Sequence, residues 1–163
     1  MSFIETERLI LRTWMDSDLE ALAAIYADPE VTRFLPGGAR SREAVREWID
    51  RAIQAQDRDG FSLWPVVRKS DHRLIGMCGF LRRSAESPIE IGFALEAGAW
   101  GQGLGEEAAR AALDYGRGVL GLREVAALVD PRNRASVRLI NRLGMRFDRV
   151  QRVGGREVLR YFA

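Results

Sequence analysis

One segment near the middle of the chain has the order strand, glycine loop, helix. An apolar run of strand length, Ile89–Leu95, is followed by Trp-Gly-Gln-Gly-Leu-Gly at residues 100–105 and then by a stretch that begins Glu-Glu-Ala-Ala. Glycines remove side chains where backbone amides must approach a ligand, and a helix that begins there adds its unpaired amides and the positive end of its dipole. The segment therefore predicts a cradle for a phosphate or pyrophosphate group.

The glycine spacing argues against two other kinds of phosphate-binding loop. Gly101, Gly103 and Gly105 are too closely spaced for the dinucleotide pattern G-x-G-x-x-G, and the lysine of a nucleoside-triphosphate loop is missing. Glu124 lies about twenty residues further on, but it precedes a strand, whereas a ribose-binding acid ends one. The ligand is therefore expected to be neither a dinucleotide nor a nucleoside triphosphate.

Three apolar runs of strand length precede the glycine loop, and Ile89–Leu95 is the third of them. Residues 61–67 and 74–81 are separated by the polar turn Ser-Asp-His-Arg, and Ile89–Leu95 follows a Ser-Pro pair. Short turns join neighbouring strands in antiparallel order. The helix after the loop leads to a short apolar run at residues 125–129, and such a crossover places that strand parallel to Ile89–Leu95. We expect a mixed, mostly antiparallel sheet.

The first third of the chain predicts one strand and two helices. Residues 8–12 have the pattern of a strand, and the apolar positions over residues 19–26 predict a helix capped by Asp16 or Ser17. A second helical pattern, within residues 41–60, runs from a serine cap to an Asp-Gly pair.

The last third predicts a helix and a hairpin. The run Asp-Pro-Arg-Asn ends in Asn133 and caps a helix that stops at Gly144. Residues 147–153 and 157–162 flank a Gly-Gly pair and predict a closing hairpin. With no internal repeat or linker, residues 1–163 are expected to form one domain of the α/β (α+β) class with about four helices.

Composition excludes several functional classes. The 163 residues are 47% hydrophobic and carry a net charge of +2, with acids and arginines interleaved. A nucleic-acid partner would need a basic face, and only the pair Arg82-Arg83 and the arginines between positions 132 and 142 are local exceptions. No segment approaches the roughly 20 apolar residues of a membrane span. The single cysteine, Cys78, cannot form an internal disulfide, which fits a reducing cytoplasm.

Three stretches of the sequence, taken in order, resemble the GNAT superfamily of acyl-CoA-dependent N-acetyltransferases, and in particular its RimJ/RimL-like branch. The stretches are Glu-Thr-Glu-Arg-Leu-Ile-Leu-Arg at residues 5–12, Glu-Ile-Gly-Phe at residues 90–93 with Trp-Gly-Gln-Gly-Leu-Gly-Glu-Glu-Ala at residues 100–108, and Asn-Arg-Ala-Ser at residues 133–136 with Leu-Gly-Met at residues 143–145. The superfamily loop often begins with arginine or glutamine, whereas tryptophan, found here at position 100, is usual in the RimJ/RimL-like branch. The resemblance spans nearly the whole chain.

The resemblance implies a GNAT fold whose central sheet is splayed between strands four and five, here Ile89–Leu95 and residues 125–129. It implies acetyl-CoA as co-substrate, with direct attack of a primary amine on the thioester in a ternary complex and with no metal. Pantetheine would lie along the splayed edge, and amides of residues 93–95 would polarise the thioester carbonyl. The implied cofactor-binding residues are Phe93, Ala94, Leu95, Gly101, Gln102, Gly103, Leu104, Gly105, Glu106, Asn133 and Ser136.

An amine acceptor arrives protonated, so the reaction needs a base. Glu90 on the central strand is the first candidate, acting directly or through a water. The alternative is that Glu90 is a surface carboxylate that alternates outward from the strand. Asp130, at the end of the fifth strand, is a second candidate, whereas His72 lies in a polar turn and is disfavoured.

The CoA thiolate that leaves needs a proton or a hydrogen-bond donor. Many superfamily members place a tyrosine seven residues after the motif asparagine, where this chain has Ile140. The RimJ/RimL-like branch carries a serine three residues after the asparagine, which makes Ser136 the implied thiolate partner and Asn133 a pantetheine ligand. Ordinary helix capping is the alternative reading of both residues.

The acceptor is not specified by the sequence. The resemblance suggests a protein N-terminus bound extended in a groove, whereas a small-molecule amine would need an enclosed, acidic pocket. A CoA-binding regulatory domain with little or no turnover is the alternative function. Exposed strand edges leave a homodimer open.

Overall fold

The central sheet determines where every other element lies. The computed structural model describes residues 2–163, and within them eight strands form one sheet in the order β1-β2-β3-β4-β5-β6-β8-β7. Neighbouring strands are antiparallel except for β5 and β6, which are parallel. The mixed, mostly antiparallel sheet is therefore confirmed. The strands are β1 (Ser2–Glu5), β2 (Leu9–Arg12), β3 (Leu63–Arg68), β4 (Arg73–Arg82), β5 (Ile89–Leu95), β6 (Ala126–Val129), β7 (Arg146–Val153) and β8 (Arg156–Phe162).

Five helices cover the sheet over the described residues, one more than expected. They are α1 (Leu19–Ala27), α2 (Pro29–Thr32), α3 (Arg42–Asp59), α4 (Leu104–Gly118) and α5 (Arg134–Arg142), with the 3₁₀ turns η1 (Asp16–Asp18) and η2 (Ala97–Ala99). The additional helix is α2, a single turn. Pro29, which ends α1, is also the first residue of α2, and the Asp28 side chain accepts a hydrogen bond from the Glu30 amide.

Two details at the start of the chain differ from the expectation. β1 pairs with β2 and adds a strand that the sequence pattern did not indicate. The predicted cap of α1 is wrong, because neither Asp16 nor Ser17 caps this turn. Instead the Asp18 carboxylate accepts the Met15 amide at 2.8 Å and both terminal nitrogens of Arg12 at 2.8 Å. The cap site thus depends on an arginine from the preceding strand.

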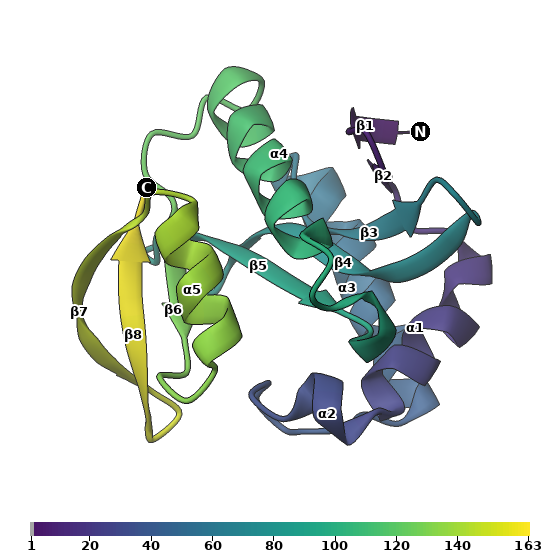
Figure 1. Cartoon of the computed structure of the whole chain (residues 1–163), viewed down its shortest axis with the longest axis horizontal. Coiled ribbons are helices and arrows are strands. Elements are labelled where there is room, and N and C mark those ends of the chain that lie inside the picture. Colours follow the sequence, from purple (N-terminus) through teal and green to yellow (C-terminus); the bar gives the residue numbers. More distant parts are fainter. Residues whose placement is uncertain (1) are drawn as a thin grey trace.

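Two hydrophobic clusters lie on opposite faces of the sheet (Figure 1). α1 and α3 pack on one face with Met77 of β4, and α4 and α5 pack on the other with Cys78 of β4. Successive residues of a strand point to opposite faces, which is why these neighbours belong to different clusters. Burial raises the pKa of the Cys78 thiol to about 12, so this cysteine is an unreactive core residue.

Two glycines of α4 differ sharply in their surroundings and should respond oppositely to alanine. A Cβ on Gly116 would lie 2.7 Å from Cζ of the fully buried Phe80, whereas a Cβ on Gly118 would meet nothing within 4 Å. We expect Gly116→Ala to lower the free energy of unfolding by about 1–2 kcal/mol, because overpacking outweighs the gain in helix propensity. Gly118→Ala should raise it by up to about 1 kcal/mol. Urea denaturation of both variants tests this, and equal shifts would contradict it.

The sheet is splayed between β5 and β6. A single residue pair, Glu90 with Ala126, joins the two strands, although β5 has seven residues. The strands are parallel, so α4, which follows β5, and α5, which follows β6, both begin near the open end of the split (Figure 1). The expected splay between the strand of residues 89–95 and the next strand is confirmed.

Candidate active site

The β5 edge that faces the split carries unpaired backbone groups. The Glu96 amide donates to the Ile75 carbonyl of β4 at 2.7 Å, and in an antiparallel pair alternate residues turn their amides to opposite edges. The amides of Phe93 and Leu95 therefore face the split. The Ala94 backbone faces β4 instead, since a Cβ on Gly76 of β4 would overlap the Ala94 carbonyl oxygen. Of the three residues predicted here, two present amides to the split.

The glycine loop combines two left-handed residues with one site of close packing. Gly101 and Gly103 have φ angles of 73° and 76°, which favour glycine. Gly105 has a different role, because a Cβ there would lie 3.2 Å from Leu139 of α5. The first two glycines shape the loop ahead of α4, and the third allows α4 and α5 to approach each other.

The other loop residues are fixed by contacts within the protein. The indole nitrogen of Trp100 donates to the Leu95 carbonyl at 2.9 Å, although nearly half of the Trp100 surface is exposed. The Gln102 side chain donates to the Gly98 carbonyl of η2 at 3.0 Å. Leu104 is buried in the core and can offer a ligand only its backbone. The loop is therefore a preformed turn whose amides precede the positive end of α4.

Two acids in the first turn of α4 are neutralised by arginines. The Glu106 side chain pairs with Arg110 at 2.9 Å and with Arg142 of α5 at 3.1 Å, and these hydrogen bonds hold the pKa of its carboxyl below the ordinary value. Glu107 pairs with Arg8 at 2.7 Å. The Glu106 side chain thus links α4 to α5, and the two carboxylates do not leave the loop with an uncompensated negative charge.

Glu90 lies at the vertex of the split and is buried. Only 4% of its surface is exposed, so the alternative of a surface carboxylate is wrong. Arg83, from the turn between β4 and β5, donates to the Glu90 carboxylate from Nε at 2.8 Å and from Nη2 at 3.3 Å. Sequence reasoning missed this pairing, although the Arg82-Arg83 pair stood out as a local basic feature. The Arg83 side chain is 45% exposed, whereas the Glu90 side chain is 5% exposed, so the pair joins a surface arginine to a buried carboxylate.

Asp130, the second candidate base, forms an ion pair with Arg132. The Arg132 guanidinium donates to it at 3.0 and 2.7 Å, and the Arg132 amide donates at 2.9 Å. These hydrogen bonds outweigh desolvation and lower the pKa of Asp130 to about 2. A carboxylate with so low a pKa is a poor proton acceptor near neutral pH.

The Asp130–Arg132 pair should make stability depend on pH in acid. The pKa of Asp130 is lower in the folded chain than the ordinary value of about 3.9, so its contribution is complete above that value and is lost as pH falls through about 2. We expect Arg132→Gln to be less stable than wild type above about pH 5, with the difference shrinking as pH approaches 2. Urea denaturation from pH 2 to 6 measures it. The control is Arg51→Gln, which breaks the exposed pair of Arg51 with Glu47 at 4.0 Å. Its difference in free energy of unfolding from wild type should not change with pH.

Asn133 and Ser136 form the cap of α5 at the open end of the split. The Asn133 side-chain oxygen accepts the Ser136 amide at 3.2 Å, as ordinary capping requires. The Ser136 hydroxyl is half-buried and has no hydrogen-bond partner among residues 2–163. Arg134 and Arg138 are exposed on the same helix. Capping accounts for the Asn133 oxygen but not for the Ser136 hydroxyl.

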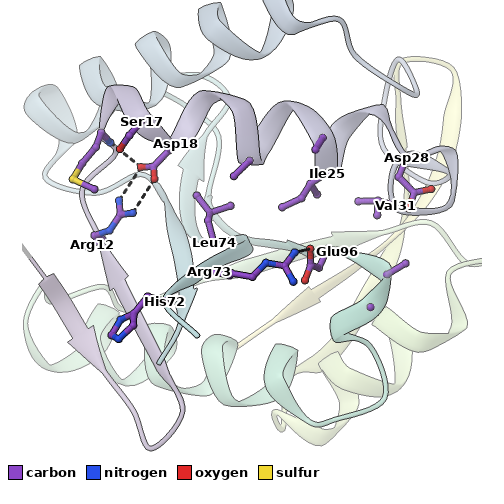
Figure 2. Close-up of a pocket in the computed structure, with 15 residues that line it drawn as sticks. Arg12, Ser17, Asp18, Ile25, Asp28, Val31, His72, Arg73, Leu74 and Glu96 are labelled. Carbon is purple, nitrogen blue, oxygen red and sulfur yellow. Dashed lines mark hydrogen bonds and ion pairs between the residues drawn. The ribbon is translucent and has the colours of Figure 1, made fainter. Parts of the chain in front are cut away.

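Figure 2 shows a cavity of about 710 Å³ between α1, the start of β4 and η2. Its apolar wall along α1 lies between the ion pairs Arg12–Asp18 and Arg73–Glu96. None of the predicted cofactor or catalytic residues lines it. It meets the glycine loop through Gly98, which lines the cavity and accepts the Gln102 hydrogen bond. Two of the three acids that line the groove are thus paired with arginines, and the third, Asp28, accepts the Glu30 amide.

Two kinds of feature are absent from residues 2–163. No group of three or more histidine, cysteine, aspartate or glutamate side chains gathers there in a way that could hold a metal ion. None of the helices in this part of the chain combines the length and apolar character needed to cross a bilayer.

Comparison with known proteins places the chain in a family. Residues 8–146 match the model of the acetyltransferase (GNAT) domain. The chain is 33% identical over 149 residues to N-acetyltransferase p20 of Bacillus licheniformis, with 88% of this chain and 82% of that protein covered. A GNAT-family acetyltransferase from Bacillus anthracis has a TM-score of 0.84 at 27% identity, covering 98% of this chain and 95% of the other.

A further solved structure shares the fold at lower identity. It is RimL, a ribosomal L7/L12 α-N-protein acetyltransferase in complex with coenzyme A, with a TM-score of 0.83 at 18% identity and coverage of 97% and 94%. The family match spans the split strands, the glycine loop and the cap of α5. The fold, the loop and these relatives agree on an acetyl-CoA-dependent acyltransferase, and the chain belongs to the GNAT acetyltransferase family.

Proposed function

We propose that this enzyme transfers an acetyl group from acetyl-CoA to the N-terminal amine of a polypeptide, as a member of the RimJ/RimL-like branch. The observation that carries the proposal is the position of Glu90 at the vertex of the β5–β6 split. An extended thioester arm that pairs with the free β5 edge would bring its reacting end toward this carboxylate. Direct attack of the amine then needs no covalent enzyme intermediate.

Each step of the transfer has a residue to support it. Glu90 would take the proton from the acceptor ammonium, directly or through a water, once Arg83 moves aside. The Phe93 amide, which faces the split, would donate to the developing oxyanion of the thioester carbonyl. The Ser136 hydroxyl would donate to the departing thiolate. The amides of the glycine loop and of the first turn of α4 would hold the pyrophosphate.

A polypeptide acceptor is favoured by the form of the groove in Figure 2. A small polyamine or aminoglycoside would need an enclosed site with several free acids, whereas this groove is open and two of its three acids, Asp18 and Glu96, are paired with arginines. RimL, which shares the fold, acts by its name on a ribosomal protein. These two observations support the acceptor class, and the acceptor itself is identified by assay.

A thiol-release assay tests the proposed function. Acetyl-CoA is incubated with the enzyme and a panel of peptides that differ at the N-terminal residue, beside the same peptides with a blocked N-terminus, and beside amino acids, polyamines and aminoglycosides. Release that requires a free peptide N-terminus is the expected result. Release with small amines alone would overturn the acceptor class. Binding of CoA without release from any acceptor would favour a regulatory CoA-binding domain.

Replacement of the proposed thiolate partner should slow turnover without loosening the cofactor. We expect Ser136→Ala to lower kcat roughly tenfold, the effect of one hydrogen bond to a charged group, with the Kd for CoA within about twofold of wild type. Single-turnover measurement of thiol release checks the rate. An unchanged kcat would leave Ser136 as a cap residue only.

A further inference from the structure

Arg8, from the run Glu-Thr-Glu-Arg at residues 5–8, reaches the glycine loop although it precedes Gln102 by 94 positions in the chain. Its Nη1 donates to the main-chain carbonyl of Gln102 at 2.9 Å. Its Nη2 lies 3.5 Å from the position that a Cβ on Gly103 would occupy. The turn between β1 and β2 therefore supports the loop directly.

Several contacts hold the Arg8 guanidinium in this position. Glu107 of α4 accepts hydrogen bonds from Arg8 Nε at 2.7 Å and from the Arg8 amide at 2.9 Å, and it forms an ion pair with Arg8 Nη2 at 2.7 Å. Thr6 donates its hydroxyl to the same carboxylate at 2.6 Å. Burial raises the pKa of Glu107, but the hydrogen bonds from Thr6 and Arg8 outweigh it and keep the pKa below the ordinary value. Glu107 is thus an ionised carboxylate that holds the Arg8 guanidinium in place.

The other side of this cluster is anchored by the only lysine of the chain. Lys69, in the turn between β3 and β4, donates from Nζ to the Thr6 carbonyl at 2.6 Å, and its amide donates to the Arg8 carbonyl at 2.9 Å. The backbone around Arg8 is therefore fixed to the sheet, while its side chain is fixed to α4.

The contact with Gln102 determines the direction of a neighbouring amide. A trans peptide is planar, so the Gly103 N–H points opposite to the Gln102 carbonyl. By holding that carbonyl on its own side, Arg8 directs the Gly103 N–H to the other face of the loop. The Gln102 side chain is held separately through Gly98, so this peptide is restrained at both its main chain and its side chain.

We propose that Arg8 is a positioning residue of the cofactor site, which orients the Gly103 amide toward the pyrophosphate by holding the Gln102 carbonyl. The inference rests on the proposed function of the loop as the pyrophosphate site. It gives a role to the motif at residues 5–8, which the catalytic steps do not use. Without Arg8 the left-handed loop must be ordered by the ligand itself, and ordering about one residue corresponds to a roughly five- to thirtyfold loss of affinity.

Binding of two probes to four proteins tests this role. Calorimetric Kd values for CoA and for pantetheine, which lacks the pyrophosphate, are measured for wild type, Arg8→Gln, Arg8→Lys and Arg68→Gln. Arg68, the last residue of β3, is likewise paired with a carboxylate, Asp71 at 2.6 Å, but none of its contacts over residues 2–163 reaches the loop, so its variant is the control. Thermal melts confirm that each variant is folded.

The expected result separates the probes. Arg8→Gln should weaken CoA binding roughly five- to thirtyfold and change pantetheine binding by less than twofold. Arg8→Lys, whose single ammonium cannot hold both Glu107 and Gln102 in the fork geometry of arginine, should lose most of the same affinity. Arg68→Gln should match wild type for both probes.

Three outcomes would overturn the inference. Equal losses for CoA and pantetheine would show general damage to the fold, and wild-type affinity of Arg8→Lys would show that charge alone matters. Unchanged CoA binding by Arg8→Gln would leave Arg8 with no role in the cofactor site. Failure of the wild type itself to bind CoA would be a separate result, which overturns the proposed function and this inference with it.

Discussion

Replacing Glu90 with glutamine is expected to lower kcat roughly 10²- to 10⁴-fold, the range for loss of a general base. Glutamine is nearly isosteric, so β5 and its edge should remain in place, and the Kd for CoA should stay within about twofold of wild type. The residual rate should rise with pH, because only the unprotonated fraction of the acceptor amine can then react. Steady-state thiol release from pH 6 to 9 measures both effects.

The matched control for Glu90 is Glu20→Gln. Glu20 of α1 is also paired with an arginine, Arg42 of α3 at 2.6 Å, and it lines neither the split nor the cavity of Figure 2. Its replacement removes a carboxylate and breaks an ion pair away from the proposed reaction centre, so kcat should not change. A Glu90→Gln enzyme that retains turnover within threefold of wild type would rule out Glu90 as the base.

The second large effect is expected at Gly76 of β4, where alanine should lower the free energy of unfolding by about 3–5 kcal/mol. A Cβ there would overlap the Ala94 carbonyl oxygen and would lie 2.8 Å from Leu95 Cα. Both atoms belong to the β5 backbone, which cannot yield as a flexible side chain would. Folded molecules of this variant should also bind CoA more weakly, because a displaced β5 carries the edge of the split with it.

Urea denaturation measures the stability of Gly76→Ala, and Gly98→Ala is its control. A Cβ on Gly98 would meet nothing within 4 Å, so its alanine variant should stay within about 0.5 kcal/mol of wild type. If Gly76→Ala lost less than about 1 kcal/mol, the close approach of β4 and β5 would not be the constraint described here.

Local patterns in the sequence predicted most of the fold. The alternating and apolar runs placed the β3-β4-β5 meander, the crossover through α4 to β6 and the closing hairpin. The α3 boundaries also follow from local chemistry, since the Ser41 side chain accepts the Ala44 amide and Gly60 adopts a left-handed φ of 80°. Such features depend on residues close together in sequence.

The errors arose where a contact crosses between elements. The Asp18 carboxylate, and not Asp16 or Ser17, accepts the Met15 amide in the turn before α1. Arg12 of β2 holds that carboxylate in place. Pro29 both ends one helix and begins another, which periodicity alone does not separate. β1 was missed because it is a four-residue edge strand that pairs only with β2.

The candidate site likewise combines features that local sequence predicts with contacts that only the fold creates. The glycine loop is visible in the sequence, but the pairing of Arg83 with Glu90 and that of Arg8 with Gln102 join residues that only the folded sheet brings together. The role of Gly105 also needed the fold, because its neighbour Leu139 comes from α5. The motif identified the loop, and packing decided what each of its residues does.

Backbone hydrogen exchange with and without CoA tests the central claim most directly, namely that the split between β5 and β6 and the loop before α4 hold the cofactor. CoA is predicted to slow exchange at the amides of Phe93, Leu95 and residues 101–105, and to leave the turn at Gly154-Gly155 unchanged. Protection concentrated along α1 and the start of β4, around the cavity of Figure 2, with no change in the split, would contradict the account.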